Sequence, residues 1–217
     1  MSKADNSKLK VALAKGSLLS PTLEVLGKIG FDITGLQDIG RKLMISTSQA
    51  DFVIARASDV PTFVEHGAVD IGFVGKDVLM ESEKDVFELL DLGYGKCVFA
   101  LAEAAGASAR TAGRYARLGH VRVATKYPKV AERYFTSRGR QIEIIKLYGS
   151  VELAPLVGLA DQIVDLVSTG KTLAENHLVV VEEIAPVSCR LIANYVSYKL
   201  KCSPIDALVA ELRAVVR

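Results

Sequence analysis

Short runs of apolar residues alternate with amphipathic stretches along most of this chain. Residues 10–14, apolar after Lys10, predict a buried strand, and apolar positions from Leu18 to Ile29 then recur at helical spacing. A strand, a short polar loop and the start of a helix follow one another again from Phe52 and from Asp70. Strands that alternate with helices in this way predict an α/β protein.

The alternation continues to the end of the chain, with one interruption. Further strands are expected over 86–92, 96–102, 121–124, 141–147, 162–167 and 178–181, with helices over 103–117, 188–201 and 204–216. The interruption is Gly93-Tyr94-Gly95, where two glycines between two strands indicate a hinge. We therefore expect two α/β lobes with a ligand cleft between them. Lobe one is expected to hold residues 8–93 plus 178–217, and lobe two residues 94–177.

Composition and charge narrow the class of protein. Half of the 217 residues are hydrophobic, so a core is available, and the formal net charge of +2 argues against a nucleic-acid binder with a broad basic surface. No apolar stretch approaches the ~20 residues needed to cross a membrane, and no signal peptide is visible at the start. The three cysteines are widely spaced and form no C-x-x-C pair, which is typical of thiols in a reducing compartment. We expect a cytoplasmic protein.

The stretch 162–173 joins a buried strand to a loop suited to an anion. Residues 162–167 have the apolar character of a covered strand, with Ile163, Val164 and Val167 β-branched, and they include one carboxylate, Asp165. The loop and the first helical residues after it are Ser168, Thr169, Gly170, Lys171 and Thr172. Hydroxyl groups, a residue without a Cβ and the positive end of a helix dipole together suit a phosphate group.

The end of this loop matches a P-loop, but its beginning does not. Gly170-Lys171-Thr172 fits the pattern G-x-x-x-x-G-K-[ST], whereas Asp165 stands where the first glycine is required. A carboxylate there would repel the phosphates of a nucleotide, so hydrolysis by that mechanism is disfavoured. A carboxylate at position 165 suits a sugar phosphate instead, because ribose hydroxyls can donate hydrogen bonds to Asp165. By local chemistry alone, a tight turn capped by Ser168 or Thr169 explains the stretch equally well.

Two other strand ends carry a cation. Lys15 and Gly16 follow the first predicted strand, where a point charge and close backbone approach again suit an anion; a solvated lysine at a turn is the plain alternative. Arg56 follows the strand that begins at Phe52, at the end of the sheet where α/β proteins usually bind ligands. A surface ion pair with Asp59 or Glu65 accounts for Arg56 equally well.

A longer pattern favours ligand binding over these plain structural explanations, because it resembles the signature of ATP phosphoribosyltransferases. The matching positions are Glu152, Gly158, Ala160, Ile163, Asp165, Leu166, Thr169, Gly170, Thr172 and Leu173. Residues 55–79 are also similar to the corresponding part of that family. The resemblance implies transfer of a 5-phosphoribosyl group from phosphoribosyl diphosphate to N1 of ATP, the first step of histidine biosynthesis.

The resemblance also implies a role for each candidate in the second lobe. The 5-phosphate is expected at residues 168–172 and the ribose hydroxyls at Asp165. Glu152 would orient the ribose or a metal-bound water. Mg²⁺ is expected to be held by substrate oxygens and water, so no metal site of the protein's own is predicted.

In the first lobe, Arg56 and Lys15 are the candidate catalytic residues, expected to face diphosphate or triphosphate oxygens. Gly16 and Ser17 complete the loop after Lys15. Ser17 stands where the family usually carries an arginine, so a bidentate phosphate contact is missing or supplied from elsewhere.

The family resemblance further implies a two-lobed fold like that of periplasmic binding proteins, and the short form of the enzyme. Short forms work with a separate subunit that resembles histidyl-tRNA synthetase, so we expect a homodimer that assembles with such a partner. Read one by one, the residues leave two other functions open. One is a protein that closes on an anionic ligand without turnover, and the other is a phosphoribosyltransferase that acts on a free base.

Overall fold

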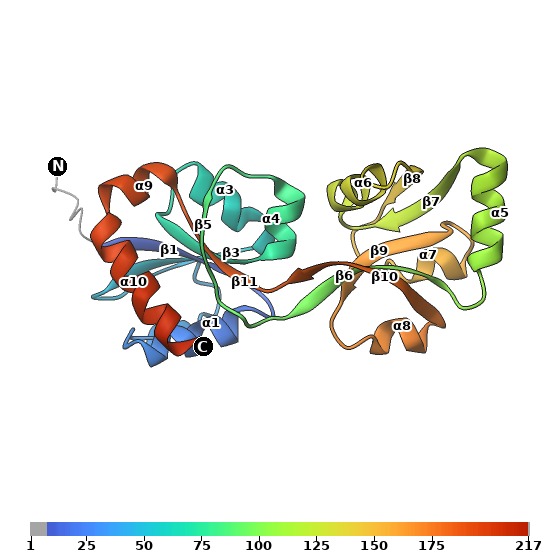
Figure 1. The fold of residues 1–217 in the computed structure, drawn as a ribbon. Helices are drawn as coiled ribbons and strands as arrows, with labels where there is room; N and C mark the ends of the chain where they lie inside the picture. The colour runs from blue at the N-terminus through green and yellow to red at the C-terminus, as the bar shows by residue number, and fades with distance from the viewer. Residues whose placement is uncertain (1–7, 217) are drawn as a thin grey trace. The chain divides into compact units, whose positions relative to one another are not determined.

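The computed structural model describes residues 8–216, and its contacts divide the chain into two compact units. Unit 1 combines the chain up to Gly95 with the chain from Ser188 onward, and unit 2 is Lys96–Val187. Each unit contains its own sheet with helices packed against it (Figure 1). The mixed α/β composition predicted from the hydrophobic pattern is confirmed.

The sheet of unit 1 is built around β1. Its strand order is β2 (Met44–Ser46), β3 (Ala50–Ala55), β1 (Leu9–Ala14), β4 (Ile71–Gly75), β11 (Cys189–Ala193) and β5 (Phe87–Asp91). β1 pairs in parallel with β3 on one side and with β4 on the other. Because parallel strands end at the same edge of a sheet, the residues that follow β1, β3 and β4 lie at one edge.

Helices cover both faces of this sheet (Figure 1). They are α1 (Leu19–Lys28), α2 (Thr34–Gln37), α3 (Val60–Glu65), α4 (Lys76–Ser82), α9 (Tyr195–Leu200) and α10 (Cys202–Val215), with a 3₁₀ turn at Ala57–Asp59. Alternate residues of each strand point to opposite faces. Phe52 and Phe73 therefore pack with α1 and α10, whereas Ala12 packs with α3. A Cβ at Gly72 would lie 2.8 Å from Val60 Cγ1, so this glycine lets α3 approach β4 closely.

The sheet of unit 2 places β9 at its centre. Its order is β10 (Leu178–Val187), β6 (Cys97–Ala104), β9 (Gln162–Val167), β7 (His120–Thr125) and β8 (Gln141–Lys146). β9 runs antiparallel to β6 and parallel to β7. This double pairing agrees with the apolar, β-branched composition that predicted a covered strand over the same residues.

Four helices complete unit 2: α5 (Ser108–Leu118), α6 (Pro128–Thr136), α7 (Leu153–Leu156) and α8 (Lys171–Glu175). α7 and α8 bury Ala154 and Leu173 in one cluster with Ile163 of β9. Tyr134 and Phe135 of α6 are buried, and their rings meet edge to face.

The helix predicted over 188–201 is wrong in its first half. Residues 189–193 form β11, which is hydrogen-bonded to β4 and β5 on its two sides, and a helix begins only after Asn194. The apolar run Cys189–Ala193 is short enough for either structure, and the two open strand edges decide in favour of a strand. The Asn194 side chain then accepts hydrogen bonds from the amides of Val196 and Ser197 and starts α9.

The helix predicted over 103–117 begins five residues later, at Ser108. β6 continues through Glu103 and Ala104 because β9 and β10 pair with it as far as these residues. The carboxylate of Glu103 is buried, where it accepts hydrogen bonds from Ser108 Oγ and Gln162 Nε2. A glutamate at that position therefore belongs to the sheet.

The strand expected over 178–181 continues to Val187, and its unit differs from the lobe to which it was assigned. β10 pairs antiparallel with β6 from Leu178↔Ala104 to Val187↔Cys97. This long ladder places 178–187 in unit 2, so the chain returns to unit 1 only at Ser188.

None of the helices in residues 8–216 has both the length and the hydrophobicity of a membrane-spanning segment.

A partly buried ion pair fastens the C-terminal part of unit 1 to its first strands. Lys201 Nζ lies 2.8 Å from Asp70 Oδ2 and also donates to the carbonyl of Lys8. Asp70 Oδ2 accepts a second hydrogen bond from the amide of Lys10. The two charged side chains are only 14% and 9% exposed.

We expect Lys201→Met to lower the free energy of unfolding by about 3 kcal/mol, because it leaves the Asp70 carboxylate buried without its cation. Urea denaturation at pH 7 measures the loss. The exposed Lys199→Met is the matched control and should change stability by less than about 0.5 kcal/mol. Equal effects of the two substitutions would contradict a stabilising role for the pair.

Candidate active site

The carboxyl end of β9 forms one wall of a pocket of about 180 Å³. The pocket is lined by Glu152, Asp165, Leu166, Val167, Ser168, Thr169, Gly170, Lys171, Thr172 and Leu173. All the candidate binding residues predicted in this half of the chain therefore lie together. Gly170 has φ +73° and immediately precedes α8, so the turn requires the left-handed conformation that glycine adopts most readily.

The loop that leads into α8 leaves several polar groups open to a ligand. Ser168 and Thr169 are exposed, and their backbone amides make no hydrogen bond within residues 8–216. The Thr169 hydroxyl accepts a long hydrogen bond of 3.4 Å from the amide of Lys171, which is the local turn that the plain alternative predicted. The Lys171 amine is exposed and lies 3.8 Å from Glu175 Oε1. The turn and an anion site are compatible, because one weak local bond leaves the other groups available.

Asp165 is the unusual group in this pocket. Its side chain is largely buried, and Oδ1 accepts a hydrogen bond of 2.8 Å from the amide of Leu166. Burial and the nearby charge of Glu152 raise the pKa of Asp165 above its ordinary value, although the Leu166 amide and Lys126 act in the opposite direction. The carboxylate therefore lacks solvation that hydroxyl donors of a ligand can supply.

Lys126 acts on this site through its charge, which lowers the pKa of Asp165, although Lys126 does not line the pocket and was not among the predicted site residues. It follows β7, which runs parallel to β9, so the two strand ends lie at the same edge of the sheet. Thr125 holds the turn there, since its buried hydroxyl donates to the carbonyl of Val164 and accepts from the amide of Tyr127. The signal in the sequence was a cation two residues after the strand predicted over 121–124, similar to the one that selected Lys15 directly after the strand over 10–14.

The remaining candidates lie at one edge of the sheet of unit 1. β1 and β3 pair up to Ala14↔Ala55, and the amide of Lys15 donates to the carbonyl of Ala55, so Lys15 and Arg56 follow neighbouring strand ends. Lys15, Gly16, Ser17 and Arg56 are all exposed. Gly16 has φ +108°, which favours glycine at this turn.

The surface ion pair proposed as a plain explanation for Arg56 is not formed. Within the described chain, Asp59 accepts a hydrogen bond from Ser58, and Glu65 binds Lys84 at 2.8 Å. The Arg56 guanidinium therefore has no carboxylate partner there. The structure places the candidates in two groups, one in each unit, and each group joins a cation to open backbone or hydroxyl groups.

Across the described part of the chain, no three or more His, Cys, Asp and Glu residues cluster in a way that could hold a metal ion. Glu152 and Asp165 bring two carboxylates to one pocket, which is fewer than a cation cage requires. The arrangement is suited to accept hydrogen bonds from vicinal hydroxyls and to donate them to a phosphate.

Comparison with known proteins gives a consistent match. A family profile described as HisG: ATP phosphoribosyltransferase matches residues 56–214. A protein named ATP phosphoribosyltransferase from Alkaliphilus metalliredigens is 50% identical over 203 residues, covering 93% of this chain and 94% of its own. One of the same name from Desulfitobacterium hafniense is 50% identical over 211 residues, covering 94% and 95%.

Solved structures agree. A chain of the ATP phosphoribosyl transferase (HisG:HisZ) complex from Thermotoga maritima has a TM-score of 0.81 and 34% identity, covering 96% of this chain and 98% of that one. The periplasmic aliphatic sulphonate binding protein SsuA from Escherichia coli has a TM-score of 0.61 at 12% identity, covering 97% of this chain and 72% of that one, which shows a shared fold only. The predicted likeness to periplasmic binding proteins is confirmed.

Ionisation of Asp165, in β9, and of Asp161, just before β9, should change the free energy of unfolding in opposite directions. The pKa of Asp165 is raised on folding, so its ionisation costs stability as pH rises from its ordinary value of 3.8 through the raised value. Asp165→Asn should therefore be as stable as the parent or more stable at pH 7, with a smaller difference at pH values below the ordinary pKa. Urea unfolding across this pH range measures the change.

Asp161→Asn is the matched control, because burial opposes ionisation of Asp161 but hydrogen bonds and charge from Arg122, with the charge of Arg114, hold its pKa below the ordinary value. Ionisation of Asp161 therefore stabilises the fold, and this variant should lose stability at pH 7. A loss of stability at pH 7 in Asp165→Asn would contradict the expected sign.

Proposed function

Because the chain belongs to the ATP phosphoribosyltransferase family, we propose that the pocket at the carboxyl end of β9 holds phosphoribosyl diphosphate. The enzyme transfers the 5-phosphoribosyl group of that substrate to N1 of ATP and releases pyrophosphate, the first step of histidine biosynthesis. Family membership removes the two functions left open by single residues, ligand capture without turnover and transfer to a free base.

One observation supports this location more than any other. A desolvated carboxylate, Asp165, shares a small pocket with a loop of hydroxyls and unpaired amides. A sugar phosphate needs both, because its hydroxyls donate hydrogen bonds and its phosphate accepts them. We assign the 5-phosphate to residues 168–172 and the ribose hydroxyls to Asp165.

Glu152 is proposed to share the ribose with Asp165 or to hold a metal-bound water. It immediately precedes α7 and lines the same pocket, and its charge raises the pKa of Asp165. Donors placed between the two carboxylates would relieve their repulsion, which is what two neighbouring ribose hydroxyls offer. Lys126 balances part of this negative charge.

Arg56 and Lys15 are proposed to contact oxygens of the diphosphate or triphosphate. Both are exposed cations at the carboxyl ends of neighbouring parallel strands, and Arg56 has no carboxylate partner in the described chain. The open turn at Gly16 admits a ligand close to the backbone. Ser17 offers a hydroxyl where the family usually has an arginine, so Arg56 is the bidentate donor of this group.

The protein contributes to this reaction mainly by orienting the substrates and by stabilising the charges that develop in the transition state. N1 of adenine already has a free lone pair, so its attack needs no general base. The barrier lies in breaking the anomeric C–O bond, while positive charge grows on the ribose and negative charge on the diphosphate. The carboxylates of Asp165 and Glu152 face the first charge, and the cations face the second, each effect contributing up to several kcal/mol. Attack opposite the leaving group inverts the anomeric carbon.

Mg²⁺ fits this scheme as a substrate-bound ion. The pocket offers only Glu152 and Asp165 as carboxylates, so we propose that the diphosphate and water supply most of its ligands. When bound there, Mg²⁺ neutralises the charge of the leaving diphosphate.

We propose that the chain forms a homodimer that assembles with a HisZ-like regulatory subunit resembling histidyl-tRNA synthetase. The support is the extended similarity to a subunit of the Thermotoga maritima HisG:HisZ complex. We also propose a cytoplasmic location, in line with the reaction's nucleotide substrate and with Cys97, Cys189 and Cys202, none of which forms a disulfide bond within residues 8–216.

Asp165→Asn tests the site directly. Without the carboxylate, charge-assisted hydrogen bonds to the ribose are lost, and kcat/KM should fall by about 100-fold or more. Pyrophosphate release from phosphoribosyl diphosphate, ATP and Mg²⁺, with and without the HisZ-like subunit, measures the rate. Glu175→Gln removes an exposed carboxylate at the end of α8 and should leave the rate nearly unchanged. An Asp165→Asn enzyme that is folded and fully active would refute the ribose assignment.

The pH profile provides a second test. Protonation removes the acceptor that the ribose hydroxyls need, so kcat/KM should fall as the solution is acidified through the pKa of Asp165. Because that pKa is raised, this acid limb should lie above the ordinary value of 3.8. The limb should be absent from the residual activity of Asp165→Asn, and its persistence there would assign it to another group.

A further inference from the structure

A second pocket, of about 620 Å³, lies at the opposite end of the central strands of unit 2. Arg122 is near the start of β7, and Asp161 immediately precedes β9, which runs parallel to β7. The loop 168–172 follows the other end of β9. The two pockets therefore share a strand but no lining residue.

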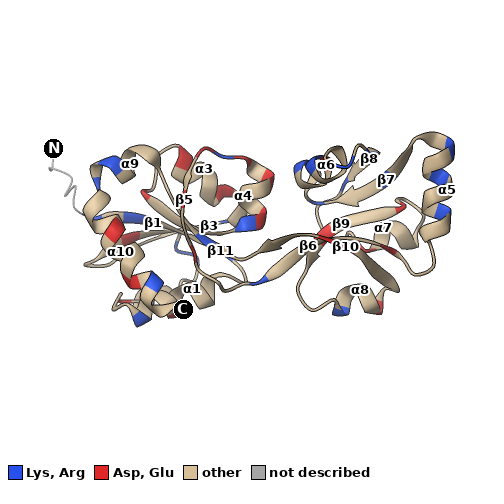
Figure 2. Cartoon of the chain, in the orientation of Figure 1, with Lys and Arg blue, Asp and Glu red and all other residues tan. Residues whose placement is uncertain are grey.

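Arginines dominate this pocket. Arg110, Arg114 and Arg117 are spaced by four and three residues, so they share one face of α5, and Arg122 joins them from β7. The ribbon of α5 is marked blue at several places along its length, all of them arginines, and α5 contains no Asp or Glu (Figure 2). Of the residues that line the pocket, Asp161 is the one carboxylate against four guanidinium groups.

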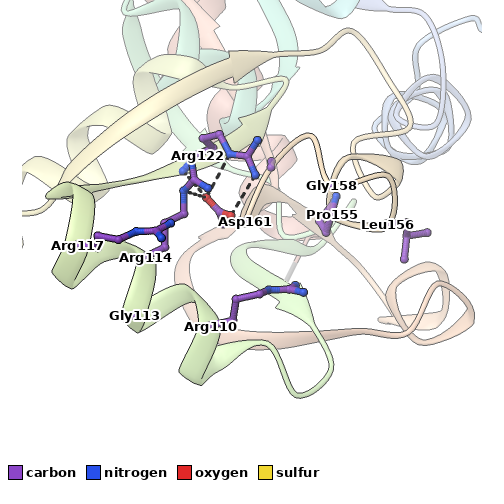
Figure 3. Close-up of a pocket in the computed structure, with 10 residues that line it drawn as sticks. Arg110, Gly113, Arg114, Arg117, Arg122, Pro155, Leu156, Gly158 and Asp161 are labelled. Atoms are coloured by element: carbon purple, nitrogen blue, oxygen red, sulfur yellow. Dashed lines mark hydrogen bonds and ion pairs between the residues drawn. The ribbon is translucent and has the colours of Figure 1, made fainter.

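The carboxylate of Asp161 is already paired with two of the arginines. Arg122 donates to Asp161 through its amide at 2.9 Å and through its guanidinium at 3.2 Å, and Arg114 Nε lies 3.0 Å from Asp161 Oδ2 (Figure 3). The Arg114 contact is an ion pair without hydrogen-bond geometry, so this buried Nε donor remains unsatisfied in the described chain. Asp161 thus fixes two of the arginines in place without neutralising the group.

The other two arginines, Arg110 and Arg117, form neither an ion pair nor a side-chain hydrogen bond within residues 8–216. Like charges on one helix face repel one another, so this arrangement is unfavourable by itself. Across the pocket, Pro155 and the half-exposed Leu156 of α7 provide an apolar wall (Figure 3).

We propose that this pocket binds an oligophosphate, either a free polyphosphate anion or the phosphate chain of a nucleotide. Guanidinium groups match phosphate oxygens with paired hydrogen bonds, and the unused donors of Arg110, Arg114 and Arg117 converge on one concavity. Its volume is that of a small-molecule site, which favours such a ligand over the flat surface of an acidic protein. This site is separate from the proposed catalytic pocket and adds a ligand that the transfer reaction does not require there.

Arginine side-chain NMR tests the proposal with a readout specific to the site. Inorganic tripolyphosphate is added to the full-length protein at about 0.15 M salt, where weak surface attraction is screened. The Nε–Hε signals of the pocket arginines, assigned through Arg110→Gln and Arg117→Gln, should shift in a saturable way. The double variant Arg110→Gln/Arg117→Gln should weaken this binding at least about tenfold, because charge-assisted hydrogen bonds are lost.

Lys199→Gln/Arg213→Gln is the matched control, since it removes two exposed cations from unit 1 and leaves the pocket intact. It should retain the binding of the parent protein. Both double variants should keep the basal rate of phosphoribosyl transfer, which is measured separately, so failure here is distinguishable from failure of the catalytic assignment. ATP that binds this pocket more tightly than tripolyphosphate would identify a nucleotide ligand with its base on the Pro155–Leu156 wall, and equal affinity would identify the bare phosphate chain.

Three results would overturn the proposal. The first is the absence of a saturable shift of the pocket signals, and the second is an equal loss of binding in the two double variants. The third is a shift of the pocket signals with a hexaglutamate peptide but not with tripolyphosphate, which would assign the pocket to an acidic protein partner.

Discussion

The register of β9 determines where the charged groups of unit 2 lie. The strand is hydrogen-bonded on both sides, with Asp165 opposite Ala100 of β6 and Val164 opposite Thr125 of β7. Side chains alternate between the faces of a strand, so Asp165 lies on the same face as Ile163, which packs with α7 and α8. A slip of one residue would carry the carboxylate to the other face, away from Glu152 and the loop. Two neighbouring strands prevent that slip.

The same strand separates two electrostatic environments. At its start, Asp161 is surrounded by arginine donors, and its ionised form stabilises the fold. Near its end, Asp165 is desolvated beside another carboxylate, and its ionised form is a cost. Residues of one type, four positions apart, thus serve as a structural anchor and as an unsatisfied acceptor. A group that the fold leaves unsatisfied is available to a ligand, and the stability lost there is typical of binding sites.

A local sequence pattern predicts the structure correctly where one element determines its own conformation. The strand over 162–167 and the turn at Gly170 follow from composition and spacing, and the structure confirms them. The same kind of pattern gives the wrong structure where a neighbouring strand decides the outcome. Residues 189–193 are a strand because they hydrogen-bond to β4 on one side and to β5 on the other. Glu103 is in a strand because β9 and β10 pair with β6 as far as this residue.

The sequence by itself determined the α/β class, the family and the residues of the β9 loop, because each depends on a short pattern of residue types. Only the tertiary structure decided that β10 belongs with β6, that Lys126 joins Asp165, and that Arg122 and three arginines of α5 share one pocket. These relations join segments far apart in the chain. Their energies depend on distance and desolvation, which a linear pattern does not contain.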